Sequence, residues 1–433
     1  MLSGDNGILQ RATDAKTNTD NAQIKERIQL AYHSALTKDI TGENGELTMP
    51  TLQEELNNEF TGKNVTITPS ADNKEWTINV DDVEETVPAG KNKEQITVAQ
   101  AKSAGTVFDA KTILIDDYKN EVVVPDRFKI ADDSGTTVKD GLVIEDDDGN
   151  QYVWVPVSNI NHDGSNKIKV NSLSEEGVEI TLGRYTFDTS TGVPPLTDET
   201  YQYGSTYATP VALGQTPTAS AAYKYYQELP TYRQSNFSSG TDGTNTTANN
   251  LASFINSVNT NKGYYIARYE ASYRENGKAA SKVSTATRTS SSTTLTSGML
   301  WNFIKQGEAA VACQGLYTGK INSDLINSYA WDTAIIYIQS MGNANYANAN
   351  RGSNTSLLNT GLTEDQKCKI FDLAGNESEW TTEYSTSSSG YGAIPCVTRG
   401  GKYNSSISST CFHGDNGANI SNVSFSFRSI LYF

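Results

Sequence analysis

The chain has 433 residues, too many for one ordinary hydrophobic core, which predicts two domains. It carries 34 basic and 50 acidic residues, and a formal charge of −16 would be repelled by nucleic-acid phosphates and anionic lipid. We therefore expect no nucleic acid among its partners. The sequence contains no apolar run near the roughly 18 residues that a bilayer-spanning helix needs.

The first strong pattern is an amphipathic helix. Over residues 24–36, apolar side chains recur in steps of three and four, which places them on one helix face. A second helical signal covers residues 52–60. Two alternating segments, 64–68 and 75–80, flank a turn-rich stretch and predict a hairpin.

A long helix followed by a small antiparallel sheet resembles the C-terminal part of a type IV pilin. The stretch Leu-Ser-Gly-Asp-Asn-Gly-Ile-Leu at residues 2–9 also resembles the segment just after the membrane helix of clostridial-type prepilin-like proteins. We assign residues 1–88 to a pilin-like helix and sheet. The resemblance implies membrane anchoring through an N-terminal segment absent here, and contacts with other pilin subunits. An unrelated helix-plus-hairpin domain is the alternative.

The rest of the chain is expected to form a linker and a larger domain. Residues 89–109 are polar and Ala-rich without periodicity, which is typical of a linker, and the second domain would span 110–433. Asp-Gly-Asn at 148–150 lies between two apolar runs and predicts a hairpin. Residues 185–250 are rich in Thr, Ser, Tyr, Gly and Pro and indicate a long insertion. Helices are expected near 251–258, 297–304 and 323–339.

Six motifs of the second domain occur in a characteristic order. They are Tyr-Val-Trp-Val-Pro-Val at 152–157, Gly-Tyr-Tyr-Ile-Ala-Arg-Tyr-Glu at 263–270, Tyr-Ala-Trp-Asp at 329–332, Phe-Asp-Leu-Ala-Gly-Asn-Glu-Ser-Glu-Trp-Thr at 371–381, Arg-Gly-Gly at 399–401 and Phe-Arg at 427–428. Together they resemble the formylglycine-generating-enzyme family, whose fold is a variant of the C-type lectin fold. The expected fold class is α+β: a pilin-like helix plus small antiparallel sheet, then an irregular C-type-lectin-like domain.

This resemblance implies a structural calcium site. Family members often bind Ca²⁺ at a Gly-Asn-x-x-Glu-Trp segment. Carried over by position, Asp372 and Glu379 would offer side-chain oxygens, while Gly375 and Glu377 would offer backbone carbonyls. The alternative is that Asp372 and Glu379 only cap turns and that Trp380 belongs to the core.

The residues that the family's oxidase activity needs are not in place. That activity uses a close pair of C-terminal cysteines, whereas Cys396 and Cys411 are fifteen positions apart. The three histidines, His33, His162 and His413, show no metal-ligand spacing. We therefore expect a binding protein and no enzyme, with a formylglycine-generating-type enzyme of altered chemistry as the alternative. The four cysteines allow two disulfides or reduced, buried thiols.

The last thirty residues lack particular residue types. From Tyr403 to Phe433 there is no Lys, Glu, Gln, Met or Trp, and none of these five types has a codon ending in C or T. An AAC codon mutated at its adenines yields only other types. Adenine-targeted mutation is how diversity-generating retroelements vary their targets. Those targets commonly carry a domain of this family, with the variable segment between an Arg-Gly-Gly-like element and Phe-Arg. The chain resembles such a variable protein; a strand-rich C-terminus selected for low charge is the alternative.

Residues 403–422 are therefore the candidate ligand-binding segment, in which small polar and aromatic side chains would give adaptable recognition. The predicted contact positions are Tyr403, Asn404, Ser406, Ser408, Phe412, His413, Asp415, Asn416, Asn419, Ser421 and Asn422. The resemblances together imply an adhesin-like protein displayed outside the cell, pilus-associated or membrane-anchored. Its partner would be a protein or glycan ligand on another cell, a phage or a host.

Overall fold

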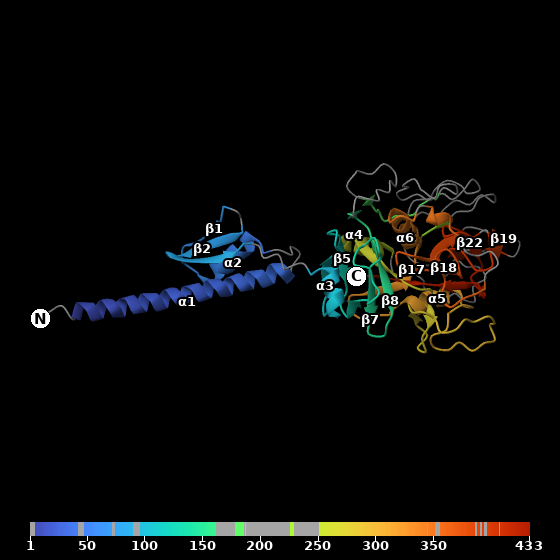
Figure 1. Cartoon of the computed structure of the whole chain (residues 1–433), viewed down its shortest axis with the longest axis horizontal. Helices are drawn as coiled ribbons and strands as arrows, with labels where there is room; N and C mark the ends of the chain where they lie inside the picture. Colours follow the sequence, from blue (N-terminus) through green and yellow to red (C-terminus); the bar gives the residue numbers. More distant parts are fainter. Residues whose placement is uncertain are drawn as a thin grey trace. The chain divides into compact units, whose positions relative to one another are not determined.

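The computed structural model divides the chain into two compact units, Met1–Gln95 and Ile96–Phe433 (Figure 1). It describes residues 5–41, 47–71, 74–89, 96–161, 178–185, 187, 226–228, 251–343, 345–350, 356–385, 388–389, 392–393, 396–406 and 408–433. Both units combine helices with antiparallel strand pairs, so the fold class is α+β. Among the described residues, no helix is long and apolar enough to cross a bilayer.

The first unit is a two-helix, three-stranded structure. Its elements are α1 (Asp5–Thr41), α2 (Met49–Glu59), β1 (Val65–Pro69), β2 (Glu75–Val80) and β3 (Val83–Pro88), and the sheet order is β1-β2-β3. α2 begins where the Thr48 hydroxyl accepts the Thr51 amide, with proline in the first turn. The third strand was not predicted. It follows β2 through Asp81 and Asp82, whose φ angles of 47° and 71° suit a tight hairpin turn.

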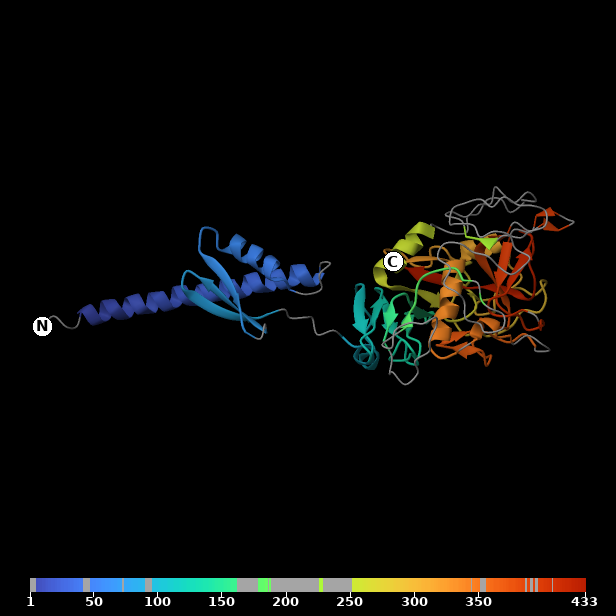
Figure 2. The same cartoon turned by 90° about the horizontal axis from the view of Figure 1, so that it is seen from above.

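The predicted helical stripe forms the core of this unit. Ile28 and Tyr32 of α1 are buried in one cluster with Trp76 and Ile78 of β2. Leu52 and other apolar residues of α2 join the same cluster, and Figure 2 shows both helices beside the sheet. The prediction that the amphipathic helix packs on the sheet containing Trp76 and Ile78 is therefore confirmed.

The predicted linker, residues 89–109, extends into the second unit, which begins at Ile96. Residues 96–109 belong to the second unit and include α3 (Val98–Ala104). Thr97 and Gln100 form a capping box at its start, and Gly105 closes it at φ +59°. Val98 and Ala101 are buried in the core of the second unit. A seven-residue helix presents too few turns for a periodic pattern to be recognised.

The main sheet of the second unit has six strands in the order β15-β24-β12-β8-β7-β6. Their bounds are β6 (Phe128–Ile130), β7 (Val143–Asp146), β8 (Gln151–Pro156), β12 (Gly263–Ala267), β15 (Asn322–Leu325) and β24 (Ser429–Tyr432). The predicted hairpin at 148–150 joins β7 to β8. The C-terminal strand β24 pairs with both β12 and β15, so the end of the chain is held inside the sheet.

A second sheet carries the motifs near the C-terminus. Its strands are β11 (Tyr226–Gln227), β18 (Ser378–Ser385), β21 (Cys396–Arg399), β22 (His413–Asn416) and β23 (Phe425–Phe427). β18 pairs antiparallel with β21 and parallel with β23. The remaining elements are β4 (Thr112–Ile115), β5 (Glu121–Val124), β9 (Asn159–Ile160), β10 (Val178–Glu179), α4 (Leu251–Asn261), β13 (Ser272–Tyr273), β14 (Ala279–Ala280), α5 (Gln306–Cys313), α6 (Ser328–Ser340), η1 (Tyr346–Asn348), β16 (Gln366–Lys367), β17 (Ile370–Phe371), β19 (Ser388–Ser389) and β20 (Gly392–Ala393).

The prediction of a helix at 297–304 is wrong. Gly298 and Phe303 have φ angles of +85° and +51°, which a right-handed helix cannot contain, and the helix in this region is α5. The helix expected at 323–339 begins only at Ser328, because residues 322–325 form β15. Of the predicted insertion at 185–250, all but 185, 187 and 226–228 lies outside the described residues.

Candidate functional site

The candidate binding segment starts at the Arg-Gly-Gly motif, where the chain passes very close to another loop. A Cβ on Gly401 would lie 2.1 Å from the Ala374 carbonyl oxygen, and one on Gly400 would lie 2.7 Å from that of Leu373. Gly400 also has φ +81°. Both glycines are therefore required by the close approach of this segment to the loop of the predicted calcium motif.

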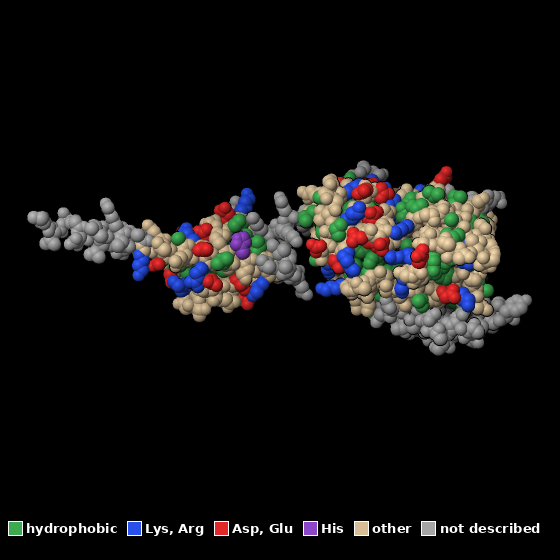
Figure 3. Space-filling view, turned by 90° about the horizontal axis from the view of Figure 1, so that it is seen from below, with side chains coloured by type: hydrophobic (Ala, Val, Ile, Leu, Met, Phe, Trp, Pro, Cys, Tyr) green, Lys and Arg blue, Asp and Glu red, His purple; other side chains and the backbone are tan. Residues whose placement is uncertain are grey.

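Nine of the eleven predicted contact positions keep accessible side chains. Those classed as exposed are Asn404, Ser406, Asn419, Ser421 and Asn422; those partly exposed are Tyr403, Phe412, Asp415 and Asn416. Ile420, between two of them, is an exposed large hydrophobic residue. In Figure 3 charged side chains gather on the half of the second unit at left, and few are seen on the half at right. Small polar groups dominate the accessible side of this segment.

Two predicted contact residues, Ser408 and His413, are buried, which contradicts their assignment as ligand contacts. They are 3% and 5% exposed, too little to contact a ligand. The Ser408 hydroxyl pairs with that of Ser405 at 3.0 Å. His413 begins β22 with its ring enclosed, and its Nε2 lies 3.3 Å from a Glu383 carboxylate oxygen. Sequence alone could not tell the inward from the outward positions because the neighbouring residues are polar on both faces.

Behind the accessible side lies a buried ionic network. Glu383 accepts from Arg184 at 2.6 Å and from Arg399 at 3.2 Å, and Arg399 also pairs with Asp332. Burial raises the pKa of the Glu383 carboxyl, but the neighbouring cationic groups outweigh this and hold it below its usual value. Burial, reinforced by Arg399, lowers the pKa of His413 to about 4. At neutral pH the imidazole is therefore uncharged beside an ionised Glu383.

A second buried pair anchors the end of the segment. The Arg428 guanidinium donates to both carboxylate oxygens of Glu379, and to the carbonyl oxygens of Ala267 and Phe371 at 3.0 Å each. Arg428 and Glu379 are fully buried. These hydrogen bonds connect Arg428, just before β24, to β12, β17 and β18. Its role is positional: Arg428 holds the end of the candidate segment in place.

The other carboxylate predicted to bind calcium, Asp372, also has protein donors. Its oxygens accept from the Thr360 hydroxyl at 2.7 Å, from the Gly361 amide at 3.1 Å and from the Thr363 hydroxyl. Burial raises the pKa of the Asp372 carboxyl to about 6 despite these donors. A cation would have to share Asp372 with these donors and Glu379 with Arg428.

The backbone part of the predicted calcium site, at Gly375 and Glu377, contacts Glu270, a contact that the sequence did not reveal. Within the described residues, no group of three or more His, Cys, Asp and Glu side chains is arranged to hold a metal. Gly375 and Glu377 lie in the tight turn before β18, where the Glu377 amide donates to Glu270 at 2.9 Å. The calcium site at Asp372, Gly375, Glu377 and Glu379 stays a prediction.

Glu270 and Glu377 form a pair of buried acids that sequence reasoning missed. Glu270 accepts from the Asn376 side chain at 2.5 Å, and Glu377 accepts from Asn302 at 2.8 Å. Burial, together with neighbouring carboxylates, raises the pKa of both well above the usual value. The only available signal was Glu270 at the end of its motif, and nothing in the sequence placed it beside residue 377. Both side chains are about fully enclosed, at 0% and 1% exposure.

The four cysteines are free thiols in this structure. Cys313, Cys396 and Cys411 are buried, and Cys368 is partly buried. Of the two states left open by the sequence, the structure therefore has the reduced one. Cys396 in β21 and Cys411 before β22 form no disulfide with each other. His162 lies outside the described residues, and His33 is exposed on α1.

Comparisons with known proteins assign no family. No protein-family model matches the chain, and no curated protein matches it. Among solved structures, one match is titled "Crystal Structure of CarF". It is 12% identical, covers 40% of this chain and 87% of that chain, and has a TM-score of 0.29. A similarity this low carries no argument about fold or function.

Proposed function

We propose that the chain is a surface-displayed, adhesin-like protein that binds its ligand through the accessible side of residues 403–422. One observation supports this most strongly: the same short segment combines buried ionic anchors with an accessible row of small polar side chains. Arg399 and Arg428 bracket the segment and are fully buried. Asn404, Ser406 and Asn419 are exposed between them. A rigid frame with replaceable outer side chains is what a diversified binding surface requires.

The low charge of this segment supports recognition by hydroxyls and amides. Asp415 is its single carboxylate between 403 and 422, in a chain of formal charge −16. Exposed substitutions on such a surface change stability by about 0.5 kcal/mol or less. The segment therefore suits adenine-directed variation by a retroelement, in a domain of the formylglycine-generating-enzyme, C-type-lectin type. The ligand would be a protein or glycan on another cell, a phage or a host.

The first unit would serve display. Its long helix α1, packed on a three-stranded sheet, agrees with a pilin-like stalk. We assign it an extracellular position, attached through pilin subunits or through a membrane anchor. A deletion of residues 1–95 would then release the second unit from the cell surface without removing ligand binding.

The buried acids do not favour catalysis. The pKa values of Glu270 and Glu377 are raised because the carboxyls are enclosed, and enclosed groups cannot reach a substrate. Without a bonded cysteine pair, the oxidase chemistry of the formylglycine-generating type also has no support. We therefore propose binding and no enzymatic activity.

Deep sequencing of clonal populations tests the proposed variation. Codons of the exposed positions 404, 406, 419, 421 and 422 should show substitutions confined to adenines. Codons of Arg399 and Arg428 should stay constant. Uniform variation across the codons 399–428, or none in the presence of a linked reverse transcriptase, would reject the retroelement reading.

A binding experiment tests the function itself. The full chain and a variant with Asn404, Ser406, Asn419 and Ser421 changed to Ala should be compared on an array of bacterial surface glycans and envelope proteins. Signals that the parent chain gives should be lost in the variant. Equal signals from both would place ligand binding outside this segment.

A further inference from the structure

A polar pocket lies outside the candidate binding segment, residues 403–422, and is connected to it by hydrogen bonds. It has a volume of about 330 Å³ and is lined by Asn343, Asn345, Tyr346, Asn348, Ala349 and Lys367. This volume lies at the low end of the roughly 300–1,000 Å³ typical of small-ligand sites. The amides of Thr410 and Cys411 donate to the carbonyls of Ala349 and Ala347, each at 3.0 Å. The pocket wall and the chain leading to Phe412 are therefore one hydrogen-bonded structure.

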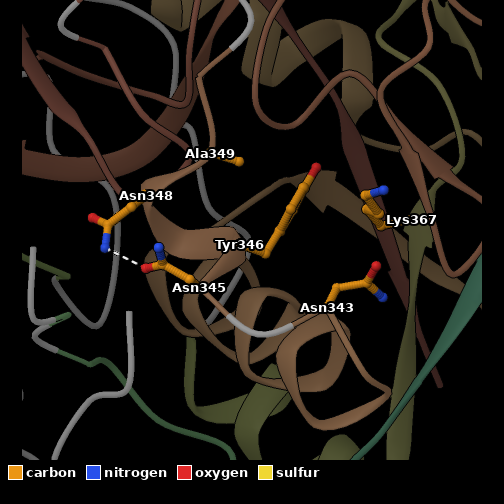
Figure 4. Close-up of a pocket in the computed structure, with 6 residues that line it drawn as sticks. All are labelled: Asn343, Asn345, Tyr346, Asn348, Ala349 and Lys367. Atoms are coloured by element: carbon orange, nitrogen blue, oxygen red, sulfur yellow. Dashed lines mark hydrogen bonds between the residues drawn. The ribbon is translucent and has the colours of Figure 1, made fainter. Parts of the chain in front are cut away.

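The described part of the lining is rich in amide groups and contains no acid. Figure 4 shows Asn343, Asn345, Asn348 and Lys367 around the ring of Tyr346, with a hydrogen bond from Asn348 to Asn345 of 2.7 Å. None of the six lining residues is acidic, although the chain has 50 Asp and Glu residues. Amide groups both donate to and accept from sugar hydroxyls, and a lysine ammonium binds an anion as a point charge.

Two of the pocket residues are held by hydrogen bonds to other parts of the fold. Tyr346 donates its hydroxyl to Asp365 at 3.0 Å, and Asn343 caps the end of α6 by donating to the Ile338 carbonyl at 3.3 Å. Asn345 has φ +65°, a conformation that asparagine tolerates better than most residues. Lys367, at the end of the short strand β16, has no ion-pair partner among the described residues. Lys367 is therefore the one cation among the described lining residues, and its ammonium can bind an anion.

We propose that this pocket binds a carboxylate-bearing sugar unit, a uronic or sialic acid residue of a glycan. The Lys367 ammonium pairs with the sugar carboxylate, and the Asn343 and Asn345 side chains bind ring hydroxyls. The inference deepens the proposed function and rests on it, because it names an acidic glycan as part of the displayed ligand. The pocket supplies a constant contact, while residues 403–422 supply the variable ones.

The test uses the full chain with free monosaccharides at millimolar concentration. Saturation-transfer NMR should detect binding of glucuronic acid, N-acetylneuraminic acid or both, and none of glucose and N-acetylglucosamine. Testing both acids distinguishes a uronic acid from a sialic acid as the sugar that supplies the carboxylate. Lys367→Gln should weaken the acid's affinity about tenfold, as expected for loss of a charge-assisted hydrogen bond. Lys367→Arg should keep most of it, and Lys320→Gln, at an exposed site elsewhere, should match the parent chain.

Two further outcomes separate this proposal from the proposed function. Asn345→Gly keeps the positive φ accessible and should also weaken acid binding if the pocket is the site. The variant with Asn404, Ser406, Asn419 and Ser421 changed to Ala should retain acid-sugar binding while losing its array signals. No binding of either acid, or equal affinity in Lys367→Gln, would overturn the pocket proposal. Loss of acid binding in the four-alanine variant would move the sugar to residues 403–422 and also overturn it.

Discussion

The inward and outward sides of residues 399–428 differ sharply in burial and charge. Inward, Arg399, His413 and Arg428 pair with carboxylates in nearly complete burial. Outward, Asn404 and Asn419 are exposed. An ionic group enclosed in protein is costly to leave unpaired, whereas an exposed amide costs little to replace. The segment is thus fixed where it meets the core and permissive where it meets solvent.

The largest effect should come from the inward side. Arg399→Met leaves Asp332 and Glu383 without their shared cation, and we expect about 3–5 kcal/mol of lost stability. Urea unfolding of the second unit, followed by tryptophan fluorescence, measures it. Arg274→Met is the matched control: it removes an exposed pair with Asp148 and should cost at most about 1 kcal/mol. A loss no larger than the control's would show that the buried network does not hold the segment.

The burial of His413 beside Arg399 should make stability depend on pH. Because the pKa of His413 in the folded chain is about 4, against 6.5 for an unperturbed imidazole, the unfolded chain binds the proton first as pH falls. Stability is therefore lost between about pH 6.5 and 4, by roughly 3 kcal/mol. His413→Gln should flatten the thermal-unfolding profile over that window, and exposed His33→Gln should leave it unchanged. The same slope in both variants would show that another group causes it.

Calcium gives a third, smaller test of the inward side. If Ca²⁺ binds at Asp372 and Glu379, free Ca²⁺ at 100 times its dissociation constant would add about 2.7 kcal/mol of stability. Thermal unfolding with millimolar Ca²⁺ against chelator measures this, and Asp372→Asn should abolish the difference. An unchanged unfolding temperature with Ca²⁺ would mean that Thr360, Gly361 and Arg428 have taken over these carboxylates.

The sequence predicted the elements whose pattern is local. The α1 stripe and the hairpin turn at 148–150 follow directly from periodicity and turn residues. The prediction of a helix at 297–304 failed because Gly298 and Phe303 have left-handed backbone conformations. The apolar residues there reach the core from an irregular segment and not through helical spacing. α3 has no signature in the sequence because seven residues are too few for a periodic pattern.

The candidate site was predictable only in outline. Its position after Arg-Gly-Gly came from motif order. The burial of His413 did not, because its partner Glu383 lies thirty positions away and Arg184 is further still. Glu270 and Glu377 were missed for the same reason: a pair of buried acids is a property of folding together distant segments. Long-range polar contacts have no periodic signature in the chain.

The central claim is that the outward side chains of residues 399–428 can be replaced without loss of stability. The smallest expected effect, an unchanged unfolding temperature, tests it most directly. Asn404, Ser406, Asn419 and Ser421 should be changed together to Ala. Asn422 is left intact because its side chain accepts the Ser424 backbone amide at 3.0 Å, whereas Asn404 donates to the Ser424 hydroxyl at the longer distance of 3.4 Å. The matched control changes the exposed residues Thr289, Ser291, Thr294 and Ser297 to Ala. The thermal unfolding temperature of the second unit should be the same in both variants as in the parent chain. A clear fall confined to the first variant would show that the outward side of residues 399–428 is structural, and would contradict its assignment as a replaceable binding surface.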